Sequence, residues 1–302
     1  MIYTGTYASF ASLKTSIETV LQSEGWTLAN GILSKGDAFV RFTATTSTLL
    51  LEAGTGKTGA VLNGAAPSGV KILDYTAAPM SFPANYDLHV FSSPDEVLLI
   101  VKYNVDRYQQ LSFGVSDVDQ VGGTGLWFTG TFRGSTNPAA VSMPIYINTS
   151  GSTLGTWGGD MSIGLFFEGY QTGAVSSYIH TGLDTTGWKT LGSVDGTIVG
   201  AGDQIAALMH SLPSQYNQST VLLPVNVTQR RLSQGQTIAA SMRNVRFCRI
   251  DNHAPEAVVP YGGENWKVYP MHRKNADQRN AVSWSVGSQY TGTYGFAVRY
   301  EV

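Results

Sequence analysis

The chain has 302 residues, a formal net charge of -2 and charged side chains at only 13% of its positions. This length suits about two or three domains with real cores, and the lack of a basic excess excludes the domain-wide charge that draws proteins to nucleic-acid phosphates. The 34 glycines, the many Ser and Thr residues and the 11% aromatic content favour an all-β or mixed fold, with much surface buried between strands or subunits.

The single cysteine and the apolar runs exclude several further classes. Cys248 has no partner for a disulfide within the chain or for a cysteine-based zinc site, and in VRFCRI we interpret it as a small apolar strand residue rather than a reactive thiol. The start, MIYTGTYASFASLK, lacks the features of a secretory signal, and no apolar run approaches the about 20 residues of a membrane helix. We therefore expect a soluble chain that stays inside the cell that makes it.

The clearest helical pattern lies in residues 7–24. Apolar side chains repeat there at helical spacing at Phe10, Leu13, Ile17, Val20 and Leu21. Gly25 stands where a left-handed C-terminal cap belongs. The pattern predicts a helix that ends at this glycine.

Strand patterns follow the helix. GWTLANGILSKGDAFVRFTAT predicts two strands joined at KGD, with Phe39 and Phe42 both packing inside. DLHVFSSPDEVLLIVKYN predicts a hairpin reversed at SPD, and RYQQLSFGVS predicts a further strand. Residues 1–117 are therefore predicted to form a small α+β docking domain.

The remainder of the chain has a different texture. Gly, Thr and Ser mix with single aromatics, as in VGGTGLWFTGTFRGSTNP, which suits short strands joined by wide loops. GDQIAALMHSLPSQ predicts one short helix near 203–212, and strand patterns then run to the end. The predicted fold class is α+β: an N-terminal helix on an antiparallel sheet, followed by a mainly β domain in residues 118–302.

Two motifs resemble ligand sites, but each lacks a required residue. Gly56-Lys57-Thr58 matches the end of a phosphate-binding loop, yet Leu51 takes the place of its first glycine, so we favour a hairpin loop. DVDQVGG starts like a calcium loop, yet Val121 and Phe128 occupy ligand positions. We favour a turn closed by aspartate side chains there.

Histidines and acids offer further candidates for chemistry. IDNHAPE brings together Asp251, His253 and Glu256, as a weak metal site or, as we favour, a polar proline-containing loop. His89 alternates with apolar neighbours and is interpreted as a half-buried structural histidine. HExxH and GxSxG motifs are absent from the sequence, whereas paired carboxylates of a glycosidase are not readable from it. We predict no enzymatic activity, no cofactor and no bound metal.

The stretch ENWKVYPMHRKNADQRN (264–280) gathers basic and aromatic side chains. As a strand it divides them between faces, with Trp266, Val268, Pro270 and His272 on one and Asn265, Lys267, Tyr269, Met271 and Arg273 on the other. The charges do not converge as in a catalytic cluster, and Arg, Trp and Tyr are residues that interfaces enrich. We predict an intersubunit or loop-anchoring role rather than a nucleic-acid patch. The candidate interface residues are Trp266, Tyr269, His272, Arg273 and Arg299.

This stretch, followed by YTGTYGFAVRYE at the C-terminus, resembles the ending of a family of tailed-bacteriophage virion proteins, known as tail, baseplate or hypothetical structural components. The shared pattern is Tyr269-Pro270, the basic tripeptide His272-Arg273-Lys274, a polar loop, and a closing strand over 291–299. The first helix followed by Gly25-Trp26 also resembles the start of such proteins. The resemblance covers the two ends of the chain but not its Gly-rich middle, and it supplies no catalytic or ligand residue.

The resemblance implies a structural component of a tailed phage particle, in the tail or baseplate, that folds in the host cytoplasm and resides in the virion. The implied partners are copies of itself in a symmetric homo-oligomer and other tail or baseplate proteins, with a tail fibre as a further candidate. Nucleic-acid binding and membrane insertion are not expected. One alternative is a glycan-binding receptor protein of the tail, using Trp127, Trp157, Trp188 or Tyr170. Others are a neck, collar or head-decoration protein and a glycan depolymerase.

Overall fold

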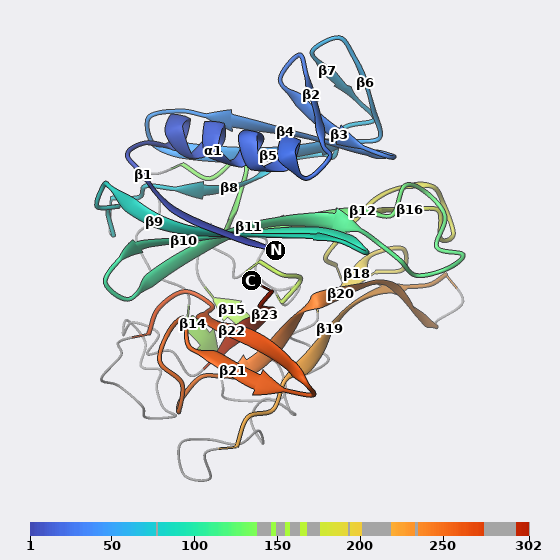
Figure 1. Cartoon of the computed structure of the whole chain (residues 1–302). Coiled ribbons are helices and arrows are strands. Elements are labelled where there is room, and N and C mark those ends of the chain that lie inside the picture. The colour runs from blue at the N-terminus through green and yellow to red at the C-terminus, as the bar shows by residue number, and fades with distance from the viewer. Residues whose placement is uncertain are drawn as a thin grey trace.

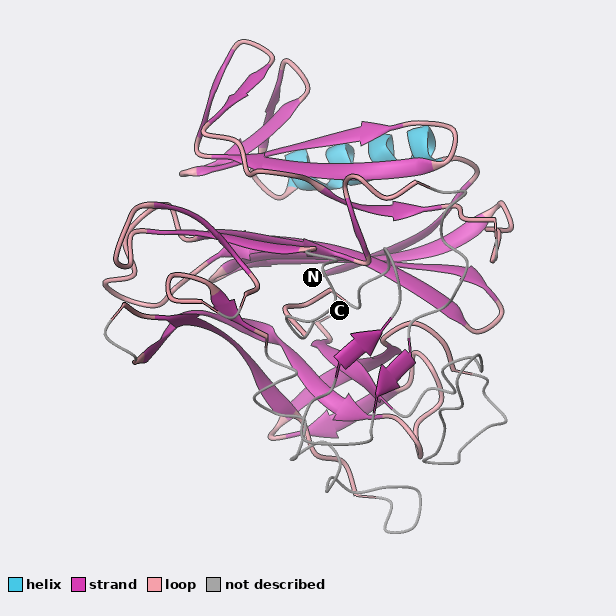
Figure 2. Cartoon of the chain, turned by 180° about the vertical axis from the view of Figure 1, so that it is seen from behind, coloured by secondary structure: helices cyan, strands magenta, loops and turns pink. Residues whose placement is uncertain are grey.

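The computed structural model describes residues 1–76, 78–137, 164–167, 176–192, 194–200, 219–232, 235–274 and 294–301, together with two short strands, β14 (Tyr146–Asn148) and β15 (Gly155–Trp157), which pair with each other. Figure 1 shows three stacked layers. An N-terminal layer of α1 and a six-stranded sheet lies on one face of a central seven-stranded sheet, and a six-stranded C-terminal sheet lies on the other. Figure 2 shows the same stacking from behind, with strands predominating.

Helix α1 (Phe10–Ser23) forms where the apolar periodicity predicts it. Ser9 caps its first turn by accepting a hydrogen bond from the Ser12 backbone, in a capping box with the Ser12 side chain. Gly25, with φ of +87°, follows its end as predicted. Residues just before the helix form strand β1 (Ile2–Tyr7), which the sequence analysis did not predict. The buried face of the helix packs against the N-terminal sheet and consists of Phe10, Leu13, Ile17, Glu18 and Leu21.

The N-terminal sheet has the order β13-β8-β5-β4-β3-β2. Its strands are β2 (Thr27–Ala29), β3 (Ile32–Lys35), β4 (Ala38–Ala44), β5 (Thr48–Gly54), β8 (Val70–Leu73) and β13 (Phe132–Arg133). Phe42 is buried, but Phe39 is only half-buried. The prediction that both pack inside is wrong because residues three apart in a strand point to opposite faces. This segment contains three strands, β2, β3 and β4, where the sequence predicted two.

A separate hairpin extends from this layer and contains the motif that resembles a phosphate loop. Its strands are β6 (Gly56–Thr58) and β7 (Val61–Asn63), with Lys57 opposite Leu62. The backbone amides of this segment therefore form a strand ladder, and the described residues 59–76 that follow it contain no helix. The hairpin interpretation is confirmed.

The central sheet has the order β1-β9-β10-β11-β12-β16-β17. Besides β1, its strands are β9 (Ala84–Ser92), β10 (Asp95–Asn104), β11 (Arg107–Val115), β12 (Leu126–Gly130), β16 (Ser177–Thr181) and β17 (Gly187–Thr190). The predicted hairpin reversed at Ser93-Pro94 is confirmed as β9 and β10. The sheet runs across the predicted boundary at 117/118, because β11 pairs with β12. Residues 1–117 thus share a sheet with later strands.

The C-terminal sheet has the order β18-β19-β20-β23-β22-β21. Its strands are β18 (Ile198–Val199), β19 (Leu223–Arg230), β20 (Gln236–Arg249), β21 (Val258–Tyr261), β22 (Glu264–Pro270) and β23 (Tyr294–Arg299). The pairing of β19 with β20 shifts between Pro224 and Val225, opposite a bulge in β20. The helix predicted near 203–212 lies outside the described residues.

The coarse fold prediction is confirmed: mostly antiparallel sheets with one short N-terminal helix. Among the described residues, no helix has the length and apolar character to cross a bilayer. Cys248 is buried on β20, and burial raises the pKa of its thiol to about 12, in agreement with the apolar interpretation.

Candidate functional site: the contact between the central and C-terminal sheets

The two faces of the central sheet differ in chemistry because successive residues of a strand point to opposite faces, and the charged residues Asp87, Glu96 and Lys102 all lie on one of them. The side chains of β9, β10 and β11 that reach the C-terminal sheet include Asp87, His89, Glu96, Lys102 and Tyr108. The alternate positions, such as Phe113, face the N-terminal layer, where its ring meets those of Trp26 and Phe42. The polar side of the sheet is therefore the place where functional side chains gather.

We call this contact the interlayer seam. It consists of Asp87, His89, Glu96, Lys102, Asp106, Tyr108 and Asp117 from the central layer, and Arg243, Asn244, Glu256, Lys267, Tyr269, His272 and Arg273 from the C-terminal layer.

One end of the seam is organised by the Asp87 carboxylate. Lys267 lies 2.5 Å from Asp87 Oδ2, and the Tyr269 hydroxyl donates to the same oxygen at 2.6 Å. His89 Nε2 lies 2.8 Å from that hydroxyl. Burial and the Asp87 charge raise the pKa of Tyr269 far above its ordinary value, so the hydroxyl keeps its proton and acts as a donor.

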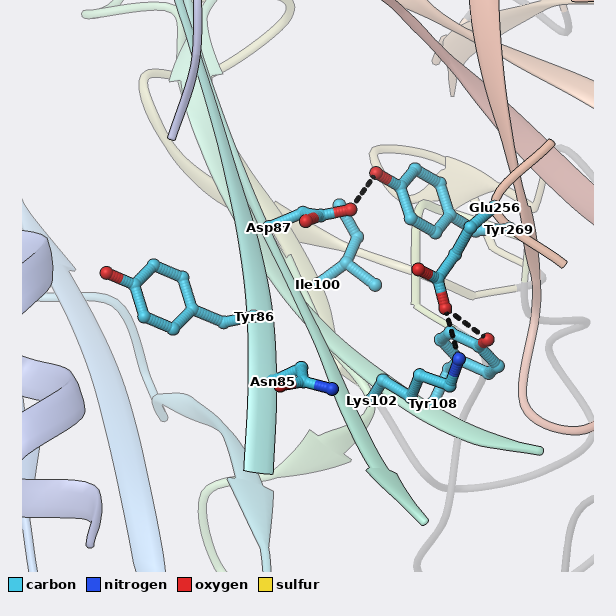
Figure 3. A pocket seen from close by; sticks show the side chains of 8 residues that line it. All are labelled: Asn85, Tyr86, Asp87, Ile100, Lys102, Tyr108, Glu256 and Tyr269. Atoms are coloured by element: carbon cyan, nitrogen blue, oxygen red, sulfur yellow. Dashed lines mark hydrogen bonds and ion pairs between the residues drawn. The ribbon is translucent and has the colours of Figure 1, made fainter. Parts of the chain in front are cut away.

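Next to this cluster lies a second carboxylate, Glu256, contributed by the C-terminal layer. Its Oε1 accepts from Lys102 Nζ and from the Tyr108 hydroxyl, both at 2.7 Å. Burial, followed by the Glu256 charge, raises the pKa of Tyr108, so this hydroxyl also remains a donor. Figure 3 shows the two carboxylate clusters side by side across the gap between the layers.

The cavity between Asp87 and Glu256 is small. Its volume of about 20 Å³ holds about one water molecule. Each carboxylate is paired with a lysine and bound by a tyrosine hydroxyl. The acids therefore have the arrangement of a structural tie, with neither the space for a sugar nor a free base beside it.

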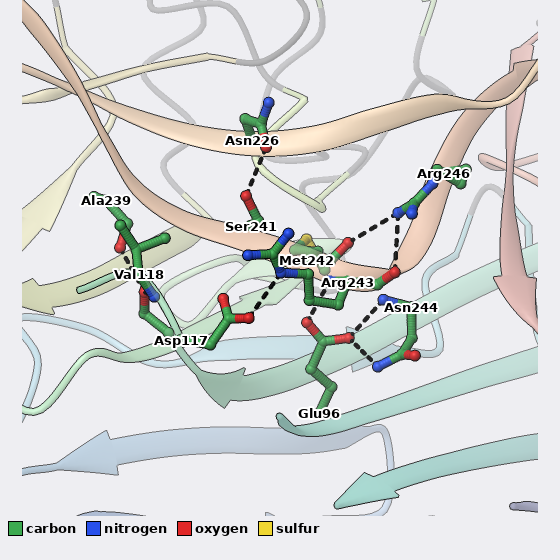
Figure 4. Close-up of polar contacts among 11 residues, drawn as sticks. Glu96, Asp117, Val118, Asn226, Ala239, Ser241, Met242, Arg243, Asn244 and Arg246 are labelled. Carbon is green, nitrogen blue, oxygen red and sulfur yellow. Dashed lines mark hydrogen bonds and ion pairs between the residues drawn. The ribbon is translucent and has the colours of Figure 1, made fainter. Parts of the chain in front are cut away.

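Glu96 forms the third tie and is fully buried. Its carboxylate accepts from the backbone of Arg243 at 2.7 Å, and from the backbone and side chain of Asn244 at 2.9 and 2.8 Å. Figure 4 shows these contacts on the bulge of β20, together with the Arg243–Asp117 pair at 2.7 Å. Burial raises the pKa of Glu96. A strand residue thus satisfies the donors that the bulge frees from the ladder.

The fourth tie anchors the segment after β22 to the turn between β10 and β11. Arg273 pairs with Asp106 at 2.7 Å, and the Tyr108 backbone donates to the His272 carbonyl at 2.7 Å. The Lys274 backbone donates to the Asp106 carbonyl at 3.0 Å. These contacts hold the segment after β22 against the β10–β11 turn, and the intersubunit or loop-anchoring role of residues 264–280 stays a prediction.

The five predicted interface residues lie on or near this contact. Trp266, Tyr269 and His272 are buried within the chain, whereas Arg273 and Arg299 are partly exposed. Trp266 packs in a small apolar cluster with Arg246 over its ring, and Arg299 lies over Phe91 and pairs with Glu301 at 2.7 Å. Tyr269, His272 and Arg273 thus contact the central layer, Trp266 lies on the opposite face of β22, and the contact of all five residues with a neighbouring subunit stays a prediction.

The predicted division of β22 into two faces is confirmed for its central residues. Lys267 and Tyr269 contact the central sheet, while Trp266 and Val268 belong to the apolar cluster on the other face. His272, beyond the end of the strand, lies against the β10–β11 turn.

The remaining candidates for chemistry separate in space. Asp251 pairs with Arg249 and Glu256 with Lys102, while His253 Nε2 lies 3.2 Å from the Thr220 hydroxyl. In the described part of the chain, no group of three His, Cys, Asp or Glu side chains could hold a metal ion. Asp117 bonds Arg243 instead of closing its own turn, so that interpretation of DVDQVGG is wrong for this residue.

The two described aromatic residues proposed for sugar stacking, Trp127 and Trp188, do not expose their ring faces together on the surface. Trp127 is fully buried, and half-buried Trp188 donates its ring N–H to the Gly64 carbonyl. The side chain of Trp157 and all of Tyr170 lie outside the described residues.

Sequence reasoning missed Asp87, Glu96 and Lys102. A signal was present, because Glu96 and Lys102 lie an even number of positions apart, and therefore on one face, at the two ends of the apolar run over residues 97–101. Their partners lie about 150 residues away along the chain, a separation that no local pattern encodes. Comparisons of the sequence with models of protein families and with curated proteins find no match.

Proposed function

We propose that this chain is a structural protein that works by assembling with copies of itself and with companion proteins. The observation that carries the proposal is the distribution of charge. Eight charged side chains pair with one another across the interlayer seam, in the pairs Asp87–Lys267, Lys102–Glu256, Asp106–Arg273 and Asp117–Arg243. Charged side chains occupy only 13% of the chain, and these eight are already paired with one another, so fewer charges remain for the outward faces.

Helix α1 shows such a face. Its exposed side is lined by Ala11, Ser12, Thr15, Thr19 and Gln22, without a charged residue. Exposed apolar side chains also occur on other layers, at Val105, Val258 and Tyr261 among others. Surfaces of this kind suit close packing against another protein better than they suit a free monomer.

The class of assembly follows from the resemblance at the two ends of the chain. We propose a virion component of a tailed bacteriophage, made in the host cytoplasm and placed in the tail or baseplate as a symmetric homo-oligomer. The seam supports this proposal because its four ion pairs tie the C-terminal sheet to the central sheet, and this tie holds the outward faces of the two layers in fixed positions at neutral pH.

Light scattering and electron microscopy of the purified full chain test the proposal. We expect a defined oligomer or ring, whereas a monomer at high protein concentration would contradict assembly by self-contact. Thr15→Lys together with Thr19→Glu places charges on the outward face of α1. Thr43→Lys, an exposed change on β4, is the matched control. Loss of the oligomer only in the helix variant would identify this face as a contact.

A further inference from the structure

Two histidines are buried in the interlayer seam, one from each layer. His89 on β9 is 0% exposed, and His272 after β22 is 1% exposed. The N-terminal layer contains no histidine over residues 1–76. The seam therefore contains two buried histidines that can gain charge in mild acid, while the opposite face of the central sheet carries His180 on β16, beside Trp188.

The hydrogen bonds of His89 fix its tautomer. The Tyr269 hydroxyl has one proton and donates it to Asp87, so it accepts from His89 Nε2. His89 Nδ1 is then unprotonated, and it makes no hydrogen bond of ordinary geometry among the described residues, although the Arg299 backbone lies close enough to favour a proton on the ring. Phe91 stacks against the ring, so that side is closed to water.

The charges around His89 oppose a second proton on its ring. Burial acts most strongly, followed by the positive charges of Lys267 and the Met1 amino group, while the Arg299 backbone acts weakly in the other direction. Together these effects lower the pKa of His89 to about 3. The nearby Asp87 carboxylate is already bound by Lys267 and Tyr269.

His272 is held in a similar environment on the opposite layer. Neither ring nitrogen has a hydrogen-bond partner in the described part of the chain. Burial and the adjacent Arg107 lower its pKa to about 3, with Arg273 acting in the same direction. The Tyr108 backbone and Asp106 act in the opposite direction, but Asp106 is paired with Arg273.

We propose that protonation of His89 and His272 in mildly acidic solution releases the C-terminal sheet from the central sheet. An imidazolium at either site would be buried beside cations, with only a backbone group as a hydrogen-bond partner for the added proton, and separation of the two layers hydrates it. Because both histidines lie in the same contact, protonation of each one favours the same separation of the two layers, and the two free-energy contributions add. The N-terminal layer stays in place.

The direction of the pH dependence follows from linkage. A histidine whose pKa is lowered in the closed state favours that state above its ordinary pKa of 6.5, and this advantage is lost as the pH falls. We assume that each ring recovers its ordinary pKa when the layers separate. The equilibrium constant for this separation then rises about 30-fold per histidine from pH 7.5 to pH 5.0, or about 1000-fold for both histidines.

Glu96 acts against the histidines. Its pKa is raised by burial, so protonation favours its buried form, and acid stabilises that single tie. His253, in the C-terminal layer, contacts Thr220 and lies outside the seam. For release to occur in acid, protonation of the two histidines must therefore destabilise the closed seam by more than protonation of Glu96 stabilises it.

Hydrogen exchange with peptide-level mass spectrometry tests the proposal on the full chain at pH 7.5 and pH 5.0, after correction for intrinsic rates. We expect faster exchange at pH 5.0 in β20 and β22 and little change in α1 and β4. The double variant His89→Gln with His272→Leu should lose this acceleration between the two pH values. Each single variant should retain an acceleration of about 30-fold. His180→Gln, a change at a residue that contacts Thr124 and Trp188, is the control and should behave like the wild type.

Equal acceleration in all three layers, or an unchanged response in the double variant, would overturn the proposal. Should a variant fail to fold, an NMR titration of the histidine ring protons in the wild-type protein tests the proposal instead. His89 and His272 rings that stay neutral while the seam is closed support the proposal, and rings that titrate near 6.5 in the closed protein contradict it.

Discussion

The central sheet is held by two contacts of different chemistry. Toward the N-terminal layer it presents mostly rings and aliphatic side chains, with Phe113 between Trp26 and Phe42. Among the described residues, a single ion pair there joins Lys35 to Asp95. Toward the C-terminal sheet it presents carboxylates, lysine and histidine within a shared apolar core. Apolar contact responds weakly to pH and salt, whereas a seam of charges responds to both. We therefore expect the contact with the N-terminal layer to persist under conditions in which the contact with the C-terminal sheet opens.

The apolar contact should show the largest single loss. Phe113→Ala removes a fully buried ring that meets two others, and we expect a loss of about 3–5 kcal/mol in the free energy of unfolding. Urea denaturation at pH 7.5 and pH 5.0 measures it, and the loss should be similar at both. Val105→Ala, a change at a residue that is 87% exposed, should stay within about 0.5 kcal/mol of the wild type. A strongly pH-dependent loss for Phe113→Ala would break the comparison.

Glu96→Ala should show the largest loss within the seam. It leaves three donors on the bulge of β20 without their acceptor, and we expect a loss of about 2–4 kcal/mol. Glu52→Ala removes a partly exposed partner of Arg41 and should cost less than about 1 kcal/mol. Limited proteolysis should cut the Glu96 variant first in the C-terminal sheet. Initial cleavage in α1 would contradict a local role.

Tyr269→Phe sharpens the comparison by removing one hydroxyl. Asp87 loses a donor and His89 loses its partner, so we expect a loss of about 1–2 kcal/mol in urea denaturation. Tyr261→Phe on the exposed edge strand β21 is the matched control and should be near neutral. Equal effects of the two changes would show that the hydroxyl bridge contributes little.

Lys102→Met should have the smallest effect. Lys102 and Glu256 are each about a third exposed, and Glu256 keeps the Tyr108 hydroxyl, so the expected loss is below about 1 kcal/mol. Because salt screens such a pair, the difference from the wild type should shrink at high ionic strength. A difference that grows with salt would point to packing of the lysine stem instead.

Much of the fold was predictable because local patterns determine it. The helix over Phe10–Ser23 has apolar residues at helical spacing and a glycine at its end, and the β9–β10 hairpin has an SPD turn between apolar runs. The faces of β22 follow from strict alternation. Phe39 is an exception to the predicted core: it lies three residues from Phe42 on β4, so the two side chains point to opposite faces of the sheet.

The seam was not predictable in the same way. Asp87 meets Lys267 across 180 residues, and Glu96 meets Asn244 across 148. Such pairings depend on which sheets stack, and that is decided by the whole core rather than by any window of sequence. The polar positions of β9 and β10 could have been recognised as one face, but not their partners.

Native-state hydrogen exchange in increasing urea at pH 7.5 tests most directly whether the two contacts differ. The amides of β20, β22 and β23 should open together at a lower free energy than those of α1, β4 and β5, because the seam can separate while the apolar contact remains. If all amides merge into a single global opening, the C-terminal sheet is not a separable layer, and the distinction between the two faces of the central sheet is wrong.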